Sequence, residues 1–67
     1  MKVRYWKWTE GEQVFRVYRH NGDYFQVWKM SQWQGSDYYE RALQDPDFTE
    51  IGKSEADVLI RVVGVNN

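Results

Sequence analysis

His20 is the only histidine in the chain, and histidine is the side chain best suited to move a proton near neutral pH. It stands next to Asn21 at a predicted turn, and no Ser or Thr accompanies it with an orienting carboxylate, as a catalytic triad requires. One histidine cannot build a metal site, and the lack of cysteine excludes thiolate zinc, iron–sulfur clusters and disulfides. We therefore interpret His20 as an exposed hairpin residue.

The acidic residues Asp45, Asp47 and Glu50 are spaced like a fragment of a calcium-binding loop. They lack the full ligand spacing and the central glycine of that motif, so we interpret them as solvated acids. Asp37 and Glu40 are three residues apart, which fits a helix capping box without any catalytic role. The five glycines form no phosphate-binding pattern. The sequence therefore predicts no catalytic residue, no metal, no cofactor and no enzyme.

Aromatic side chains are the most unusual feature of the composition. The 67 residues include four Trp, five Tyr and three Phe, which make 18% of the chain aromatic. A chain of this length closes one core, so residues 1–67 are predicted to form a single small domain with a thin margin of stability. Aromatic rings bury a large area per residue, which suits such a core. Self-association would be a further source of stability.

The net charge of −1 conceals an asymmetry along the chain. Residues 1–34 hold six basic and three acidic side chains, whereas residues 35–67 hold three basic and seven acidic ones. This asymmetry fits either two solvated faces that differ in charge or an electrostatic field that orients a partner. No apolar run approaches the ~20 residues of a membrane span, and the N-terminal stretch is unlike a signal peptide. We expect a cytoplasmic protein that does not bind membranes.

Residues 1–30 are rich in Val, Phe, Tyr and Trp and are interrupted at Gly11 and Gly22. This pattern is typical of a three-stranded antiparallel β-meander. A two-residue turn at Asn21 and Gly22 would mix charged and apolar groups on both sheet faces. Three-residue loops, each ending in a left-handed glycine, give one consistent apolar face instead. We therefore favour that register. Its apolar face consists of Val3, Tyr5, Phe15, Val17, Phe25 and Val27.

The second half of the chain changes to a helical period. A short helix is predicted over residues 36–44, capped by Ser36 or Asp37 and ended by Asp45 before Pro46. Phe48 and Ile51 look like anchors on an extended connector. A C-terminal helix is predicted over residues 54–64, although the β-branched residues at 55–63 also fit a fourth strand. The predicted fold is thus α+β, with the meander packed on one face by both helices.

The opposite face of the predicted sheet combines aromatic and cationic side chains. Such patches mark interaction sites, and Trp, Tyr and Arg dominate binding hot spots. Two structural alternatives stay open: the rings and guanidinium groups could form a stabilising ladder, or Trp33 and the first helix could cover the face. The predicted partner-binding residues are Arg4, Trp6, Arg16, Tyr18, Tyr24 and Trp28.

These features favour a non-enzymatic protein-binding module, acting as a small inhibitor or adaptor of another protein. The alternative is a single-stranded nucleic-acid-binding protein, in which bases stack on rings while cations track phosphates. The sequence pI of about 5.7 and the lack of any Lys/Arg cluster weigh against that alternative. A homodimer formed through the same face is compatible with the protein-binding function, because a symmetric dimer would bury the aromatic residues.

Overall fold

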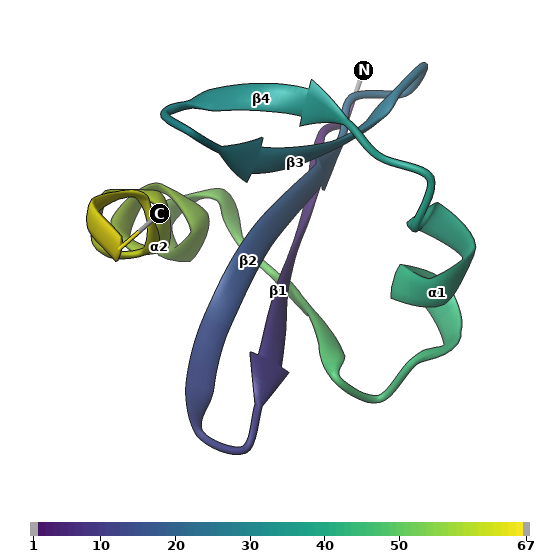
Figure 1. Ribbon diagram of the computed structural model, residues 1–67. Coiled ribbons are helices and arrows are strands. Elements are labelled where there is room, and N and C mark those ends of the chain that lie inside the picture. Colours follow the sequence, from purple (N-terminus) through teal and green to yellow (C-terminus); the bar gives the residue numbers. More distant parts are fainter. Residues whose placement is uncertain (1, 67) are drawn as a thin grey trace.

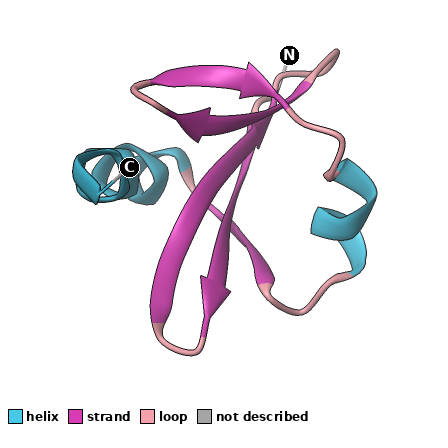
Figure 2. Cartoon of the chain, in the orientation of Figure 1, coloured by secondary structure: helices cyan, strands magenta, loops and turns pink. Residues whose placement is uncertain are grey.

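The computed structural model describes residues 2–66, with side chains described for residues 2–62. Within this range the chain forms one antiparallel sheet in the order β4-β3-β2-β1-β5, together with two helices (Figures 1 and 2). The elements are β1 (Arg4–Glu10), β2 (Gln13–His20), β3 (Phe25–Lys29), β4 (Gln32–Gly35), α1 (Tyr39–Gln44), β5 (Phe48–Ile51) and α2 (Lys53–Asn66). The predicted α+β class is therefore confirmed.

The sheet is larger than the predicted three-stranded meander. The meander is present as β1, β2 and β3, but β4 adds to its β3 edge, where Trp33 lies opposite Trp28. The segment predicted as an extended connector forms β5 and adds to the β1 edge, where Phe48 lies opposite Trp8. Both additions pair backbone groups that a three-stranded meander would leave open along β3 and β1.

The two helices lie on opposite faces of the sheet, so the prediction that both cover one face is wrong (Figure 1). On one face, Ala42 of α1 is buried in a cluster that also contains Trp6, Tyr18, Phe25 and Phe48. On the other face, Ala56 of α2 is buried with Tyr5 and Val17. Because strand side chains alternate between the two faces, a strand with apolar residues at successive positions needs cover on both sides.

The predicted strand register is also wrong, for a local reason at the β2–β3 loop. The loop spans four residues, 21–24, because the side-chain oxygen of Asn21 accepts the backbone N–H groups of Asp23 and Tyr24 at 3.0 and 2.9 Å. Val27 consequently lies opposite Tyr18, and Phe25 opposite His20. Phe25 therefore belongs to the α1 side of the sheet, and not to the side of Tyr5 and Val17.

At the β1–β2 turn the expected bulge lies inside the strand instead of in the loop. Glu10 pairs with Gln13, which leaves a two-residue turn that contains Gly11 at φ 63°. The register then shifts between Trp8 and Thr9, so that Phe15 is the extra residue on β2. A bulge of this kind re-aims the side chains next to it. Here it places Arg16 directly opposite Trp8.

The helix boundaries differ modestly from the predicted ones. The first helix begins at Tyr39 and not at residue 36, and its N-cap residue Tyr38 makes no side-chain cap. It ends at Gln44, as predicted, and the C-cap residue Asp45 has an extended backbone before Pro46. Residues 55–63 are helical and not a fourth strand, although α2 begins at Lys53 and continues beyond the predicted stop at Gly64.

Candidate binding site

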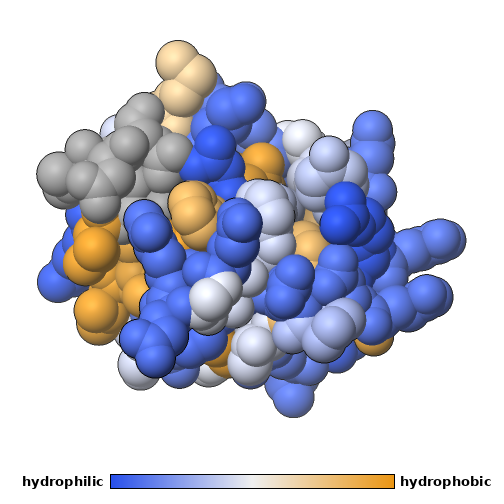
Figure 3. Space-filling model, turned by 60° about the horizontal axis from the view of Figure 1, so that its bottom comes forward, coloured by the Kyte–Doolittle hydropathy of each residue, from blue (hydrophilic) through white to orange (hydrophobic). Residues whose placement is uncertain are grey.

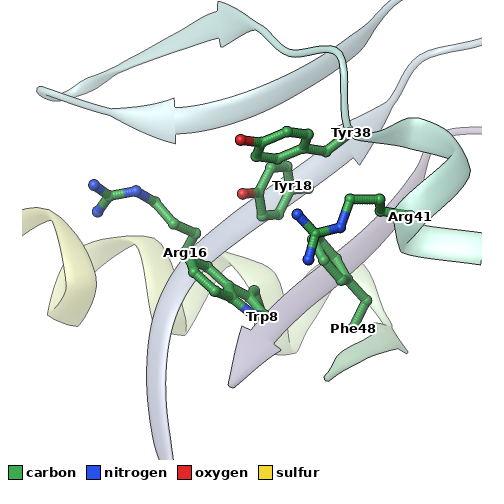
Figure 4. Close-up of a pocket in the computed structure, with 6 residues that line it drawn as sticks. All are labelled: Trp8, Arg16, Tyr18, Tyr38, Arg41 and Phe48. Carbon is green, nitrogen blue, oxygen red and sulfur yellow. The ribbon is translucent and has the colours of Figure 1, made fainter. Parts of the chain in front are cut away.

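A pocket of about 200 Å³ opens between α1 and the sheet. We call it the α1-side pocket. Its lining combines four aromatic rings with two guanidinium groups, drawn together from β1, β2, β5 and the segment around α1 (Figure 4). The lining residues are Trp8, Arg16, Tyr18, Tyr38, Arg41 and Phe48.

The floor of the pocket is formed by rings from three neighbouring strands. Trp8 on β1 lies directly opposite Phe48 on β5, and their rings are stacked with centroids 6.2 Å apart and planes inclined by 14°. Tyr18 on β2 tilts against Phe48 at 5.1 Å. Phe48 and Tyr18 are buried, whereas Trp8 is half-buried. The floor is therefore a continuous aromatic surface that is partly open at Trp8.

Arg16 supplies one of the two positive charges at the rim. The bulge at Phe15 places Arg16 opposite Trp8 on the adjacent strand. The Nη1–H group of Arg16 donates to the carbonyl oxygen of Phe15 at 3.2 Å. Figure 4 shows its guanidinium group directed away from the rings. Arg16 therefore contributes a charge at the mouth of the pocket and not in its floor.

Arg41 supplies the second charge from the opposite wall. Its guanidinium carbon lies 5.3 Å from the centre of the Tyr38 ring, and the side chain extends from α1 toward Tyr18 (Figure 4). Its Nη2–H group donates to Asp45 Oδ2 at 3.2 Å, which forms an i,i+4 ion pair. The Arg41 side chain is 59% exposed, so this ion pair lies in contact with water.

Asp45 is held by two donors at once. The backbone N–H of Asp47 donates to its Oδ1 at 2.9 Å, while Arg41 donates to its Oδ2. The backbone hydrogen bond is the larger cause, and the Arg41 charge a further one, that lowers the pKa of Asp45 from its ordinary value. Asp45 thus stays ionised beside Arg41 and neutralises part of the positive charge at the pocket.

The Tyr18 hydroxyl group lies in a partly desolvated place. Burial raises the pKa of Tyr18 because removal from water disfavours the phenolate. The charges of Arg16 and Arg41 act in the opposite direction but do not overcome burial. Tyr18 therefore keeps its proton at neutral pH and can donate a hydrogen bond.

The six predicted partner-binding residues do not share one face. Only Arg16 and Tyr18 line the α1-side pocket. Trp6 is 2% exposed, which makes it a core residue beside Ala42 of the first helix. The alternative that Trp33 and the first helix cover this face therefore holds for the helix only, because Trp33 packs on the α2 side. Arg4 lies 4.9 Å above the Trp6 ring and forms a two-pronged ion pair with Glu50, with bonds of 2.9 and 2.8 Å.

The remaining two predicted residues lie elsewhere. Trp28 packs on the α2 side of the sheet, where its ring meets that of Trp33 edge-on at 5.2 Å. Tyr24 is 67% exposed in the β2–β3 loop. The predicted partner-binding residues did not include four of the lining residues, which are Trp8, Tyr38, Arg41 and Phe48. The three-residue spacing of Tyr38 and Arg41, which places them on one side of a helical turn, was the available signal.

His20, the first candidate for proton transfer, has a structural role. The ring of His20 stacks on that of Tyr39 at 4.3 Å, and its Nδ1 accepts the backbone N–H of Gly22 at 3.1 Å. The side chain is half-buried, so the interpretation as an exposed hairpin residue is wrong. Within the described part of the chain, no group of three or more His, Cys, Asp or Glu side chains could hold a metal ion.

A second surface lies on the outer side of α2. Val58 and Val62, one helical turn apart, are 58% and 57% exposed, and apolar side chains gather on this side of the molecule (Figure 3). This stripe lacks the convergent charged and aromatic groups of the α1-side pocket, so we place the candidate site in that pocket. Over residues 2–66, no helix is long and apolar enough to cross a membrane.

Comparisons with known proteins found no relative of this chain. No protein-family model, no curated protein and no solved structure matches the chain. What the protein does is therefore inferred from the α1-side pocket itself.

Proposed function

We propose that this chain is a non-enzymatic protein-binding module, a small inhibitor or adaptor, that docks through the α1-side pocket. One observation carries the proposal: a partly open aromatic floor lies between two guanidinium groups in a single hollow. Tryptophan, tyrosine and arginine dominate the binding energy of protein interfaces when they surround a pocket that an anchor side chain can fill. The lining groups can form hydrogen bonds, stack on rings and attract negative charge, and these are non-covalent contacts that bind a partner.

The charges around the pocket favour a protein over a nucleic acid. Asp45 pairs with Arg41 at 3.2 Å, so an acid lies beside one of the two arginines of the pocket. The backbone of Asp47 also lies next to β1, because its carbonyl oxygen accepts the N–H of Thr9 at 2.9 Å. A strand of successive phosphates needs a continuous positive track, which Asp45 interrupts. A single carboxylate on a protein partner needs only one positive group, such as Arg41, and not a continuous track.

Site-specific photo-crosslinking tests this function. A benzoylphenylalanine in place of Tyr38, which is 47% exposed at the pocket wall, would react with whatever occupies the pocket in cells that express the protein. The matched control carries the same group in place of Val58, on the opposite helix. We expect an adduct from position 38 that protease digests and nuclease leaves intact.

The adduct also discriminates between the alternatives. Mass spectrometry would identify either another protein, as proposed, or a second copy of this chain, which would make the pocket a homodimer interface. A nuclease-sensitive adduct would favour single-stranded nucleic acid and overturn the proposal. Equal adducts from positions 38 and 58 would mean that contact is unspecific, which would also overturn it.

A further inference from the structure

The α1-side pocket has room for one side chain of moderate size. An engineered apolar cavity of ~150 Å³ accommodates benzene, so a volume of about 200 Å³ holds one ring or one branched aliphatic group. The stacked pair of Trp8 and Phe48 offers a flat apolar surface for such a group. The hydroxyl-bearing rings of Tyr18 and Tyr38 complete the lining.

Arg41 is already engaged with a carboxylate, and this contact indicates what the pocket recognises. Asp45 accepts from Arg41 through an i,i+4 ion pair in which the Arg41 side chain is 59% exposed and the Asp45 side chain 22% exposed. An i,i+4 ion pair whose arginine is in contact with water stabilises a protein only slightly, so an incoming carboxylate can reach Arg41 from the solvent side and replace Asp45. Asp45 would remain satisfied after the exchange, because the backbone N–H of Asp47 still donates to its Oδ1.

We infer that the α1-side pocket binds an acidic–apolar anchor of a partner protein, in which one large apolar side chain enters the pocket and a neighbouring carboxylate takes the place of Asp45 on Arg41. This inference rests on the proposed function and specifies the chemistry of the partner. Arg16 at the opposite rim attracts the same negative charge. Asp45 acts as an internal competitor that weakens unspecific binding of anions.

Three blocked peptides test the inference directly. The first has the sequence Gly-Glu-Phe-Glu-Gly, the second replaces both Glu with Gln, and the third replaces Phe with Gly. Binding to the purified protein is followed by NMR through the indole N–H signal of Trp8, assigned with Trp8→Phe. We expect saturable binding of the first peptide and about tenfold weaker binding of the other two, because each lacks one half of the anchor.

Three variants then test whether Arg41 binds the carboxylate of the peptide. Arg41→Gln should weaken binding of the first peptide about tenfold and bring it near that of the Gln peptide. Asp45→Asn should tighten binding severalfold, because it removes the competing charge but keeps the Oδ1 acceptor for Asp47. Arg61→Gln, an equal change of charge on the exposed side of α2, should leave binding unchanged.

Specific outcomes would overturn the inference. Equal affinity for the Glu and Gln peptides, no response to Arg41→Gln, or no binding of any peptide would each contradict an acidic–apolar anchor. A short oligothymidylate that shifts the Trp8 signal more than the first peptide does would contradict it too. If the crosslink at position 38 still captured a protein in any of these cases, the protein-binding function would stand and only the anchor chemistry would fail.

Discussion

The ring of Tyr18 on β2 stacks on the ring of Phe25 on β3, with centroids 5.2 Å apart and planes inclined by only 8°. The two residues are not directly opposite, since Tyr18 faces Val27 and Phe25 faces His20. They are diagonal neighbours, which aromatic side chains are long enough to bring into contact. Tyr18 therefore belongs both to the buried core and to the floor of the α1-side pocket.

The first prediction concerns the titration of Tyr18. Its pKa is raised by burial, so its folded-state pKa lies above that of the unfolded chain, which is about 10. The stability that this group contributes is present below about pH 10 and is lost as the pH rises through the folded-state pKa. A tyrosinate absorbance titration of the native protein should show a late step, in which a phenol ionises above the pKa of tyrosine in the unfolded chain.

Tyr18→Phe is the matched variant for this titration. It keeps the stacked ring and removes only the hydroxyl, so the late-ionising step should disappear while the protein stays folded. Tyr24→Phe, in the exposed loop, should leave that step in place. If the late step survives in Tyr18→Phe, burial of Tyr18 is not its origin.

The second prediction concerns the burial of Trp6. Its indole is in edge-to-face contact with Phe25 at 5.7 Å and with Tyr39 at 6.0 Å. Trp6→Ala should therefore lower the free energy of unfolding by about 3–5 kcal/mol, enough to unfold much of a domain this small. Tyr24→Ala should change it by less than about 0.5 kcal/mol. Urea denaturation followed by circular dichroism measures both, and a folded, stable Trp6→Ala protein would contradict the core assignment.

The third prediction concerns the turn between β3 and β4. Met30 and Ser31 both have positive φ, at 55° and 61°, in a two-residue turn that favours Asn followed by Gly. Residues with a Cβ atom are strained in this conformation. Met30→Asn combined with Ser31→Gly should therefore raise the free energy of unfolding by about 1–2 kcal/mol.

A substitution at Gly11 tests the same cost of a Cβ atom at positive φ in the opposite direction. Gly11 has φ 63°, and a Cβ atom there would meet nothing within 4 Å, so only the backbone opposes a side chain. Gly11→Ala should lower the free energy of unfolding by about 1 kcal/mol. The urea midpoints of the two turn variants should thus move in opposite directions, and movement in the same direction would rule out backbone strain as the common cause.

The fourth prediction concerns stability in acid. The guanidinium of Arg4 lowers the pKa of Glu50, and the N–H of Asp47 together with Arg41 lowers the pKa of Asp45. A carboxyl with a lowered folded-state pKa contributes stability above its unfolded pKa, about 4, and loses it as the pH falls through the folded-state value. The urea midpoint should therefore decline below about pH 4.

Two substitutions separate the contributions of these carboxyl groups. Glu50→Gln removes the β1–β5 ion pair and should flatten the acid decline, as should Asp45→Asn at the end of α1. Glu12→Gln, an exposed acid in the β1–β2 turn, serves as the control with an equal change of charge. A decline that is as steep in both variants as in the control would mean that other groups govern acid unfolding.

Several parts of the fold could be predicted because they depend on neighbouring residues in the chain. Gly22 and Gly11 have the positive φ that their turns require, and Asp45 before Pro46 ends the first helix. The helical character of residues 55–63 followed from the spacing of Ala56, Leu59 and Ile60, which all pack toward the sheet. Of the six predicted partner-binding residues, Arg16 and Tyr18 line the α1-side pocket, although the sequence predicted an open sheet face and not a pocket under α1.

The strand register and the set of residues that line the α1-side pocket depended on specific contacts. The alternation of apolar and polar residues along the strands does not encode these contacts. The side chain of Asn21 lengthened one loop, and the bulge at Phe15 shifted another strand. Each shift moves side chains to the other face of the sheet, because strand residues alternate. The short polar strands β4 and β5 became strands only by pairing with β3 and β1.

By itself, then, the sequence determined the α+β class and the local ends of turns and helices, because backbone preferences and hydrophobic periodicity act over a few residues. Only the tertiary structure decided that α1 and α2 cover opposite faces of the sheet. That decision buried Trp6 and brought Arg41 from the acidic half of the chain beside Trp8 and Phe48. The burial of Trp6 and the proximity of Arg41 to Trp8 depend on how segments distant in the sequence pack on the two faces of the sheet, and local sequence patterns do not encode that packing.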